Sequence, residues 1–230
     1  MNPLSLRTEL LEVTKTARVF AMGPAPEETD RILVALHGYA QHPAYFLKRL
    51  EPLAAEGWAI LAPEGLHRFY IQGTSGRVGA SWMTSEDREN DIKDYVRYLE
   101  SMRAQLMPPS PRFPHGQHRV LLGFSQGVPT AARWAAAHPG GWDQLIFWAG
   151  IFPPDLEQWA PPPQATWSRI PIDWALGDQD PFFQDAHYVP AETWFDQHQI
   201  PYRTHRFEGG HHLDFPLLER LLREGSRSDT

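Results

Sequence analysis

The 230-residue chain contains no cysteine. This absence excludes disulfides, thiolate nucleophiles and cysteine-type zinc sites. The chain also has no run of Lys and Arg long enough to follow a phosphate backbone, and its formal net charge is −7. We therefore expect no nucleic-acid partner and no attraction to an anionic membrane surface.

Long apolar runs are absent as well. None approaches the roughly 18 residues that a membrane-spanning helix needs, and the first twenty residues have no signal-peptide pattern. We therefore expect no stable membrane insertion and a cytoplasmic location. Hydrophobic residues make up 42% of the chain and charged residues 21%, as in ordinary globular proteins. The length and composition predict a single domain over residues 1–230.

Short apolar runs alternate with segments of helical periodicity along most of the chain. The predicted strands are 31–37, 58–62, 119–124, 144–148, 172–176 and 202–207, and the predicted helices are 43–56, 86–106, 127–137, 188–199 and 213–224. This alternation predicts an α/β fold with a mostly parallel sheet and helices on both faces. We expect an N-terminal antiparallel hairpin over 8–22 and a long irregular loop over 63–84.

The segment Gly123-Phe124-Ser125-Gln126-Gly127 joins a predicted buried strand to an alanine-rich helix. A G-x-S-x-G pattern in this position is typical of a serine nucleophile on a sharp, strained turn. The positions two before and two after the serine need to lack side chains for the turn to close. The pattern makes Ser125 the candidate nucleophile.

Candidate acid and base residues follow the ends of two later strands. Asp178 and Asp180 come directly after the 172–176 strand, and His211 and His212 come after the 202–207 strand. Parallel strands present their carboxyl ends at one edge of a sheet, so these residues are expected near Ser125. The order of serine, acid and histidine is that of a catalytic triad. We favour Asp180 over Asp178, and the residues themselves leave the choice of histidine open.

The segment His37-Gly38-Tyr39 follows the first strand of the predicted sheet core. In this position we expect a backbone amide that helps to hold an oxyanion, and we assign it to Tyr39. The second amide is that of Gln126, directly after the nucleophile. His37 is expected to be a structural hydrogen-bonding residue.

Four motifs together resemble the phospholipase/carboxylesterase family, which includes acyl-protein thioesterases. They are LHGY at 36–39, LGFSQG at 122–127, GDQDP at 177–181 and FEGGHH at 207–212. The resemblance implies an α/β-hydrolase fold, with Ser125 as nucleophile, Asp180 as orienting acid, His212 as base, and the amides of Tyr39 and Gln126 as oxyanion donors. It also implies hydrolysis of carboxylic esters through an acyl-enzyme, without metal or cofactor. Val128-Pro129 and the bulky Tyr39 loop depart from the thioesterase pattern and weaken a specific assignment to acyl-protein thioesterases.

The substrate is expected to be a small-molecule or lipid-like ester, with thioesters and lysophospholipids as further classes; the oligomeric state is left open. Trp82, Trp148 and Phe182 are candidate substrate-binding residues, and the Pro- and Trp-rich stretch 152–171 is either a lid or pocket wall, or a surface loop packed on the core. Two alternatives remain: a non-catalytic binding module, and a metal hydrolase built on His211, His212 and Asp214. The absence of an H-E-x-x-H helix argues against the second.

Overall fold

The computed structural model describes residues 6–114, 116–159, 164–183 and 187–226. Its centre is a seven-stranded sheet in the order β1-β3-β2-β6-β7-β8-β9, in which every neighbouring pair is parallel except β1 with β3. The strands are β1 (Val19–Met22), β2 (Arg31–Leu36), β3 (Ala59–Pro63), β6 (His118–Phe124), β7 (Gln144–Trp148), β8 (Ile172–Gly177) and β9 (Arg203–Phe207). The mostly parallel sheet expected from the sequence is confirmed.

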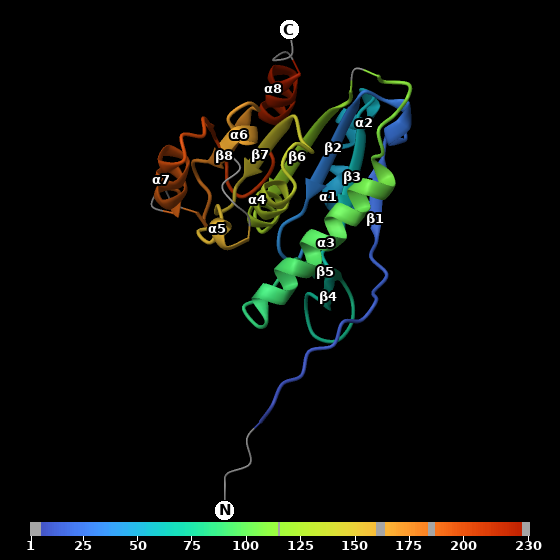
Figure 1. Ribbon diagram of the computed structural model, residues 1–230, viewed down its shortest axis with the longest axis vertical. Coiled ribbons are helices and arrows are strands. Elements are labelled where there is room, and N and C mark those ends of the chain that lie inside the picture. Colours follow the sequence, from blue (N-terminus) through green and yellow to red (C-terminus); the bar gives the residue numbers. More distant parts are fainter. Residues whose placement is uncertain (1–5, 115, 160–163, 184–186, 227–230) are drawn as a thin grey trace, which may run out of the picture.

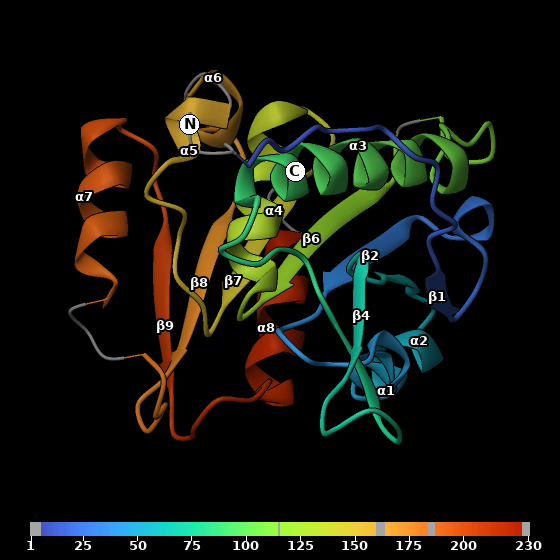
Figure 2. The ribbon, with the colours of Figure 1, turned by 90° about the horizontal axis from the view of Figure 1, so that it is seen from below.

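Helices cover both faces of this sheet (Figure 1, Figure 2). One face carries α3 (Arg88–Leu106), α4 (Gly127–Ala137) and α7 (Val189–Gln197), and the other carries α1 (Pro43–Lys48), α2 (Glu51–Ala55) and α8 (Phe215–Gly225). Each face has its own apolar core, because successive strand residues point to opposite sides. Leu33 and Ala35 therefore join one core, and Ile32 and Val34 the other.

Helix α4 shows how the sequence brings a helix close to the sheet. It begins at Gly127, directly after the turn that carries Ser125, and is buried along almost its whole length. Its alanines have little side-chain volume, so the helix axis can approach β6 and α3 closely. A Cβ on Gly127 would lie 2.3 Å from the carbonyl oxygen of Leu36, which makes glycine necessary where the helix starts.

The N-terminal hairpin expected over 8–22 does not form. Residues 6–18 have no regular secondary structure, and only Val19–Met22 forms a strand, which pairs antiparallel with β3. The segment instead runs past α3, where the Tyr98 hydroxyl donates to the carbonyl oxygen of Arg18. Its large apolar side chains are exposed, and within the described residues the segment 6–18 pairs with no strand.

The segment 63–84, expected to be irregular, contains the antiparallel hairpin of this fold. Strand β4 (His67–Tyr70) pairs with β5 (Val78–Ser81) in a separate two-stranded sheet. The predicted helix over 43–56 is likewise two short helices, α1 and α2, with Pro52 in the first turn of the second. A proline is tolerated at that position because the first-turn amide needs no helical partner.

The stretch 152–171 contains two short helices, α5 (Leu156–Trp159) and α6 (Gln164–Trp167), and its residues 160–163 lie outside the described part of the chain. Phe152 and Trp167 are buried in an aromatic cluster with Phe147, Trp174, Trp194 and Phe195. Their side chains therefore stabilise the core on the α7 side rather than lining an opening. No described helix is both long and apolar enough to cross a membrane.

Candidate active site

Ser125 stands at the carboxyl end of β6 in a strained backbone conformation. Its φ is 55°, a left-handed value that is costly for a residue other than glycine, and its amide donates to the carbonyl oxygen of Trp148 at 2.8 Å. The glycines expected on either side are required sterically, since a Cβ on Gly123 would lie 2.5 Å from the carbonyl oxygen of Gly127. The sharp turn and its glycine flanks match the sequence expectation.

An Asp–His pair lies at the same edge of the sheet. Nδ1 of His211 is 2.8 Å from Oδ2 of Asp180, and the other carboxylate oxygen of Asp180 accepts from the amide of Phe182 at 2.9 Å. The Asp180 side chain is buried, and the imidazole of His211 packs against Phe124, the residue before Ser125, with ring centroids 5.0 Å apart. A carboxylate that accepts a hydrogen bond from Nδ1–H orients the imidazole and leaves Nε2 free to accept.

The expectation that His212 partners Asp180 is not met by this geometry. The ring of His212 packs back on Phe207 and Gly209, its side chain is exposed, and its carbonyl oxygen accepts from the indole of Trp148 at 2.8 Å. Adjacent residues in the loop point to different sides, and only His211 points toward Asp180. Asp178 accepts from the amide of Gly209 at 2.9 Å and so closes the turn between β8 and the histidine loop.

The two backbone amides assigned to an oxyanion site are both free. Among the residues that the structure describes, the amides of Tyr39 and Gln126 donate no hydrogen bond, although neighbouring amides do. Gly38 brings its loop close to the nucleophile, because a Cβ there would lie 3.0 Å from the Cβ of Ser125. Unpaired amides beside a serine hydroxyl are available to an anionic oxygen. The Tyr39 ring is exposed and stacks on Phe69.

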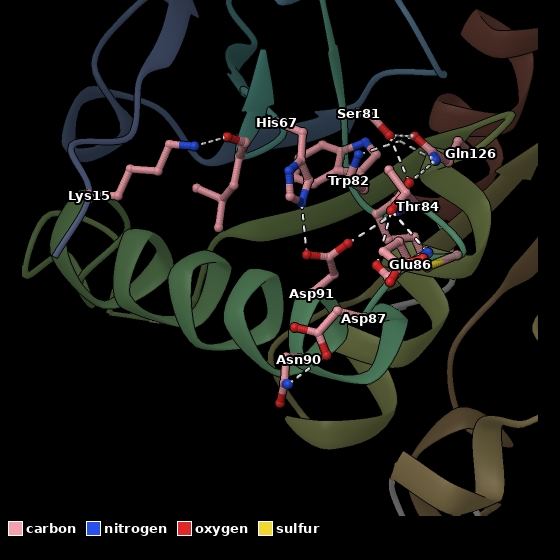
Figure 3. A network of polar contacts seen from close by, with 12 residues as sticks. Lys15, His67, Ser81, Trp82, Thr84, Glu86, Asp87, Asn90, Asp91 and Gln126 are labelled. Atoms are coloured by element: carbon pink, nitrogen blue, oxygen red, sulfur yellow. Dashed lines mark hydrogen bonds and ion pairs between the residues drawn. The ribbon is translucent and has the colours of Figure 1, made fainter. Parts of the chain in front are cut away.

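The side chain of Gln126 ties the turn that carries Ser125 to the segment after β5 (Figure 3). Its Oε1 accepts from the amide of Trp82 at 3.1 Å, and its Nε2 donates to the carbonyl oxygen of Met83 at 2.9 Å and to the hydroxyl of Ser81 at 3.1 Å. The Ser81 hydroxyl donates in turn to the carbonyl oxygen of Met83. No role was expected for Ser81, and its only sequence signal is its position directly before Trp82 in the 63–84 segment.

The same network ties the β4–β5 hairpin to α3. Nε2 of His67 is 2.8 Å from Oδ1 of Asp91, and Oδ2 of Asp91 accepts from the amide of Thr84 at 3.1 Å (Figure 3). The segment between β5 and α3 is thus bound at both ends. Gln126 therefore contacts a segment that is itself anchored.

A second glutamine, also missed, holds the 37–41 loop. Oε1 of Gln41 accepts from the amide of Gly38 at 2.9 Å, and Gln41 forms an antiparallel bridge with Ala80 of β5. These contacts fix the backbone on both sides of Tyr39, whose amide has no acceptor within the described ranges.

His37 has the structural role that the sequence predicted. It is fully buried, its Nε2 accepts from the amide of Gly65 at 3.0 Å, and its Nδ1 lies 2.7 Å from the carbonyl oxygen of Gly38. Its own carbonyl oxygen accepts from the indole of Trp82. Burial lowers the pKa of His37 to about 4, so the imidazole is neutral at pH 7.

Two of the three expected substrate-binding residues are buried. Trp82 and Trp148 have 0% of their surface exposed, so they support the site from within and offer no surface to a substrate. Phe182 is 64% exposed, and its ring lies 4.9 Å from that of His211. Its contact with a substrate stays a prediction.

The residues of the alternative metal site, His211, His212 and Asp214, do not gather around one point. His211 contacts Asp180, and Asp214 caps α8 by accepting from the amide of Leu217 at 2.8 Å. Within the described ranges no group of three or more His, Asp or Glu side chains could hold a metal ion.

Comparison with known proteins gives matches in structure only. No family model matches the chain, and no curated protein matches it by sequence. Among solved structures, acyl-protein thioesterase 2 of Zea mays is similar at a TM-score of 0.69 and 16% identity, over 93% of this chain and 99% of that one. The carboxylesterase of Bacillus cereus (TM-score 0.65, 14% identity, 92% and 94% covered) and a phospholipase/carboxylesterase of Dyadobacter fermentans DSM 18053 (0.64, 13%, 94% and 99%) are also similar. The chain therefore has the α/β-hydrolase fold of these esterases and thioesterases.

Proposed function

We propose that this chain is a serine hydrolase that cleaves carboxylic esters, with Ser125 as nucleophile, His211 as general base and Asp180 as the group that orients it. The observation that carries the proposal is the Asp180–His211 hydrogen bond, which lies at the same sheet edge as the strained Ser125. The fold shared with esterases and thioesterases supports the reaction class.

The reaction follows from the positions of the proton donors and acceptors. His211 holds a proton on Nδ1 toward Asp180, so Nε2 takes the hydroxyl proton as Ser125 attacks the ester carbonyl carbon. The carbonyl oxygen becomes an oxyanion, which the amides of Tyr39 and Gln126 stabilise. The carbon–oxygen bond to the alcohol then breaks, and His211 returns the proton to the leaving alcohol. Water attacks the acyl-enzyme in the same way and releases the acid.

Matched pairs of variants test each assignment. Ser125→Ala should abolish hydrolysis of p-nitrophenyl acetate and labelling by a fluorophosphonate probe. His211→Ala should lower kcat by about a thousandfold or more, whereas His212→Ala should retain most of it, and Asp180→Asn should cost far more than Asp178→Asn. Far-ultraviolet circular dichroism of all variants controls for folding.

The outcomes are distinct. Wild-type rates in Ser125→Ala would refute the nucleophile, and a larger loss in His212→Ala than in His211→Ala would move the base to His212. A wild-type protein that neither hydrolyses esters nor reacts with the probe would instead be a binding module.

A further inference from the structure

A groove of about 890 Å³ opens beside the 37–41 loop, and its charged side chains are all cationic. Lys48 and Arg49 contribute from the end of α1, and Arg77 contributes from the turn before β5. Among the described residues that line it there is no Asp or Glu. The charge of this groove is therefore opposite in sign to the net charge of −7 of the whole chain.

The three cations are not used in internal ion pairs. None of them lies within 4 Å of a carboxylate in the described ranges, and the only charge-related contact among them places the Lys48 ammonium over the ring of Tyr45 at 5.6 Å. Arg18 and Arg68, near the same hairpin, are by contrast both paired with Glu64. The groove therefore keeps positive charge available to a ligand, and charges that share one concave surface add to a local potential.

The groove is linked to the candidate nucleophile through shared neighbours, and Ser125 itself is not among the described residues that line it. Gln41 lines it and also holds the amide of Gly38, and a Cβ built on Gly38 would lie 3.0 Å from the Cβ of Ser125. Phe46 lines it as well and packs against Phe124, with ring centroids 5.7 Å apart. On each of these two routes a single residue, Gly38 or Phe124, thus stands between a groove-lining residue and Ser125, which places the cationic groove next to the candidate site.

We infer that this groove binds an anionic group of the ester substrate, a carboxylate or a phosphate. The inference rests on the proposed ester hydrolysis and specifies its substrate class: esters that carry a negative charge on the acyl or the alcohol side of the scissile carbonyl. Arg49 and Arg77 supply hydrogen-bonding guanidinium groups suited to carboxylate and phosphate oxygens, and Lys48 supplies a point charge.

The test compares esters that differ only in charge. On the acyl side, 4-nitrophenyl hydrogen glutarate is compared with its neutral methyl ester, 4-nitrophenyl methyl glutarate. On the alcohol side, 3-carboxyphenyl butyrate is compared with 3-carbamoylphenyl butyrate. We expect kcat/KM to favour the anionic member of one pair by about tenfold, because each partly exposed ion pair should raise kcat/KM by a few-fold. The pair that shows the preference identifies which side of the ester enters the groove. Glutarate and inorganic phosphate, tested as competitive inhibitors, distinguish the two anions.

Charge-removing variants then locate the preference. Arg49→Gln and Arg77→Gln should each lower the anionic-to-neutral ratio of kcat/KM by about three- to fivefold, mainly through KM, and raising the salt concentration should lower it in the wild type. Arg220→Gln is the matched control, because Arg220 lies on α8 and outside the groove, and it should leave the ratio unchanged.

The results separate the inference from the proposed function. Hydrolysis of the neutral esters with no preference in either pair, or a ratio that Arg49→Gln and Arg77→Gln leave unchanged, overturns the inference and leaves the esterase intact. Absence of both hydrolysis and fluorophosphonate labelling in the wild type overturns the proposed function, and the inference falls with it.

Discussion

Lowering the pH from 7.5 to 4.5 should destabilise the fold through His37. In the folded chain, Nε2 of this buried imidazole accepts from the amide of Gly65, and a proton on Nε2 would face that N–H with no acceptor. Burial lowers the pKa of His37 to about 4 from an ordinary value of 6.5. The unfolded chain therefore takes up this proton as the pH falls below about 6.5, while the folded chain stays neutral until about pH 4. The contribution of His37 to stability is thus complete above pH 6.5 and is lost on acidification toward pH 4.

The size of the effect follows from the two pKa values. Over the full interval, the difference corresponds to about 3 kcal/mol in the free energy of unfolding, and between pH 7.5 and 4.5 about 2.5 kcal/mol of it should be lost. That is a large fraction of the 5 to 15 kcal/mol typical of a folded domain.

Urea unfolding followed by tryptophan fluorescence measures this directly, at constant ionic strength and several pH values. His37→Gln keeps an acceptor for the Gly65 amide but cannot titrate, so it should lose about 2.5 kcal/mol less than the wild type over the same range. Asp155→Asn is the control. Although burial opposes ionisation, hydrogen bonds from Arg133 and Trp159 hold the pKa of Asp155 at about 2, so its effect on stability falls below this pH window. An equal acid-induced loss in His37→Gln and in the wild type would refute the reasoning.

Two further predictions concern the turn that carries Ser125. Ser81→Ala removes a hydroxyl that binds the Gln126 side chain, and it should lower kcat about tenfold with little change in KM, because the amide of Gln126 acts on the transition state. Steady-state kinetics on p-nitrophenyl acetate measure this, and a change in KM alone would contradict it. Gly123→Ala should destabilise the fold by about 2 kcal/mol or more, because its Cβ would collide with the carbonyl oxygen of Gly127; an unchanged urea midpoint would exclude this close approach.

The sequence was most informative where one local pattern determined one element. The strand 144–148 and the helix 127–137 have the predicted bounds, because a continuous apolar run and an alanine-rich segment after a glycine turn each have one favourable structure. The β4–β5 hairpin was missed because its strands are only four residues long, and β5 is buried at three consecutive positions, so neither strand gives an alternation long enough to recognise.

The choice between neighbouring residues depended on tertiary contacts. His211 and His212 share the same loop and the same chemistry, and only the position of Asp180 distinguishes them. Trp82 and Trp148 were likewise expected to line a substrate pocket because they are aromatic. Both are fully buried, and both indoles donate to backbone carbonyls. A sequence pattern states which side chains are near an edge but does not state which way each one points.

The separateness of the β4–β5 hairpin has a consequence for how specificity can diverge. The hairpin forms a sheet separate from the seven-stranded sheet. In its 71–77 turn, Gly73 and Gly76 have open space where a side chain would stand. A side chain would meet no packed neighbour at those two positions, but their φ values of 62° and 92° favour glycine, whereas Ser125, Asp180 and His211 are fixed by the ends of the main sheet. The remaining residues of this turn are exposed, so a mutational library that keeps the two glycines could alter ligand choice there without disturbing the main sheet.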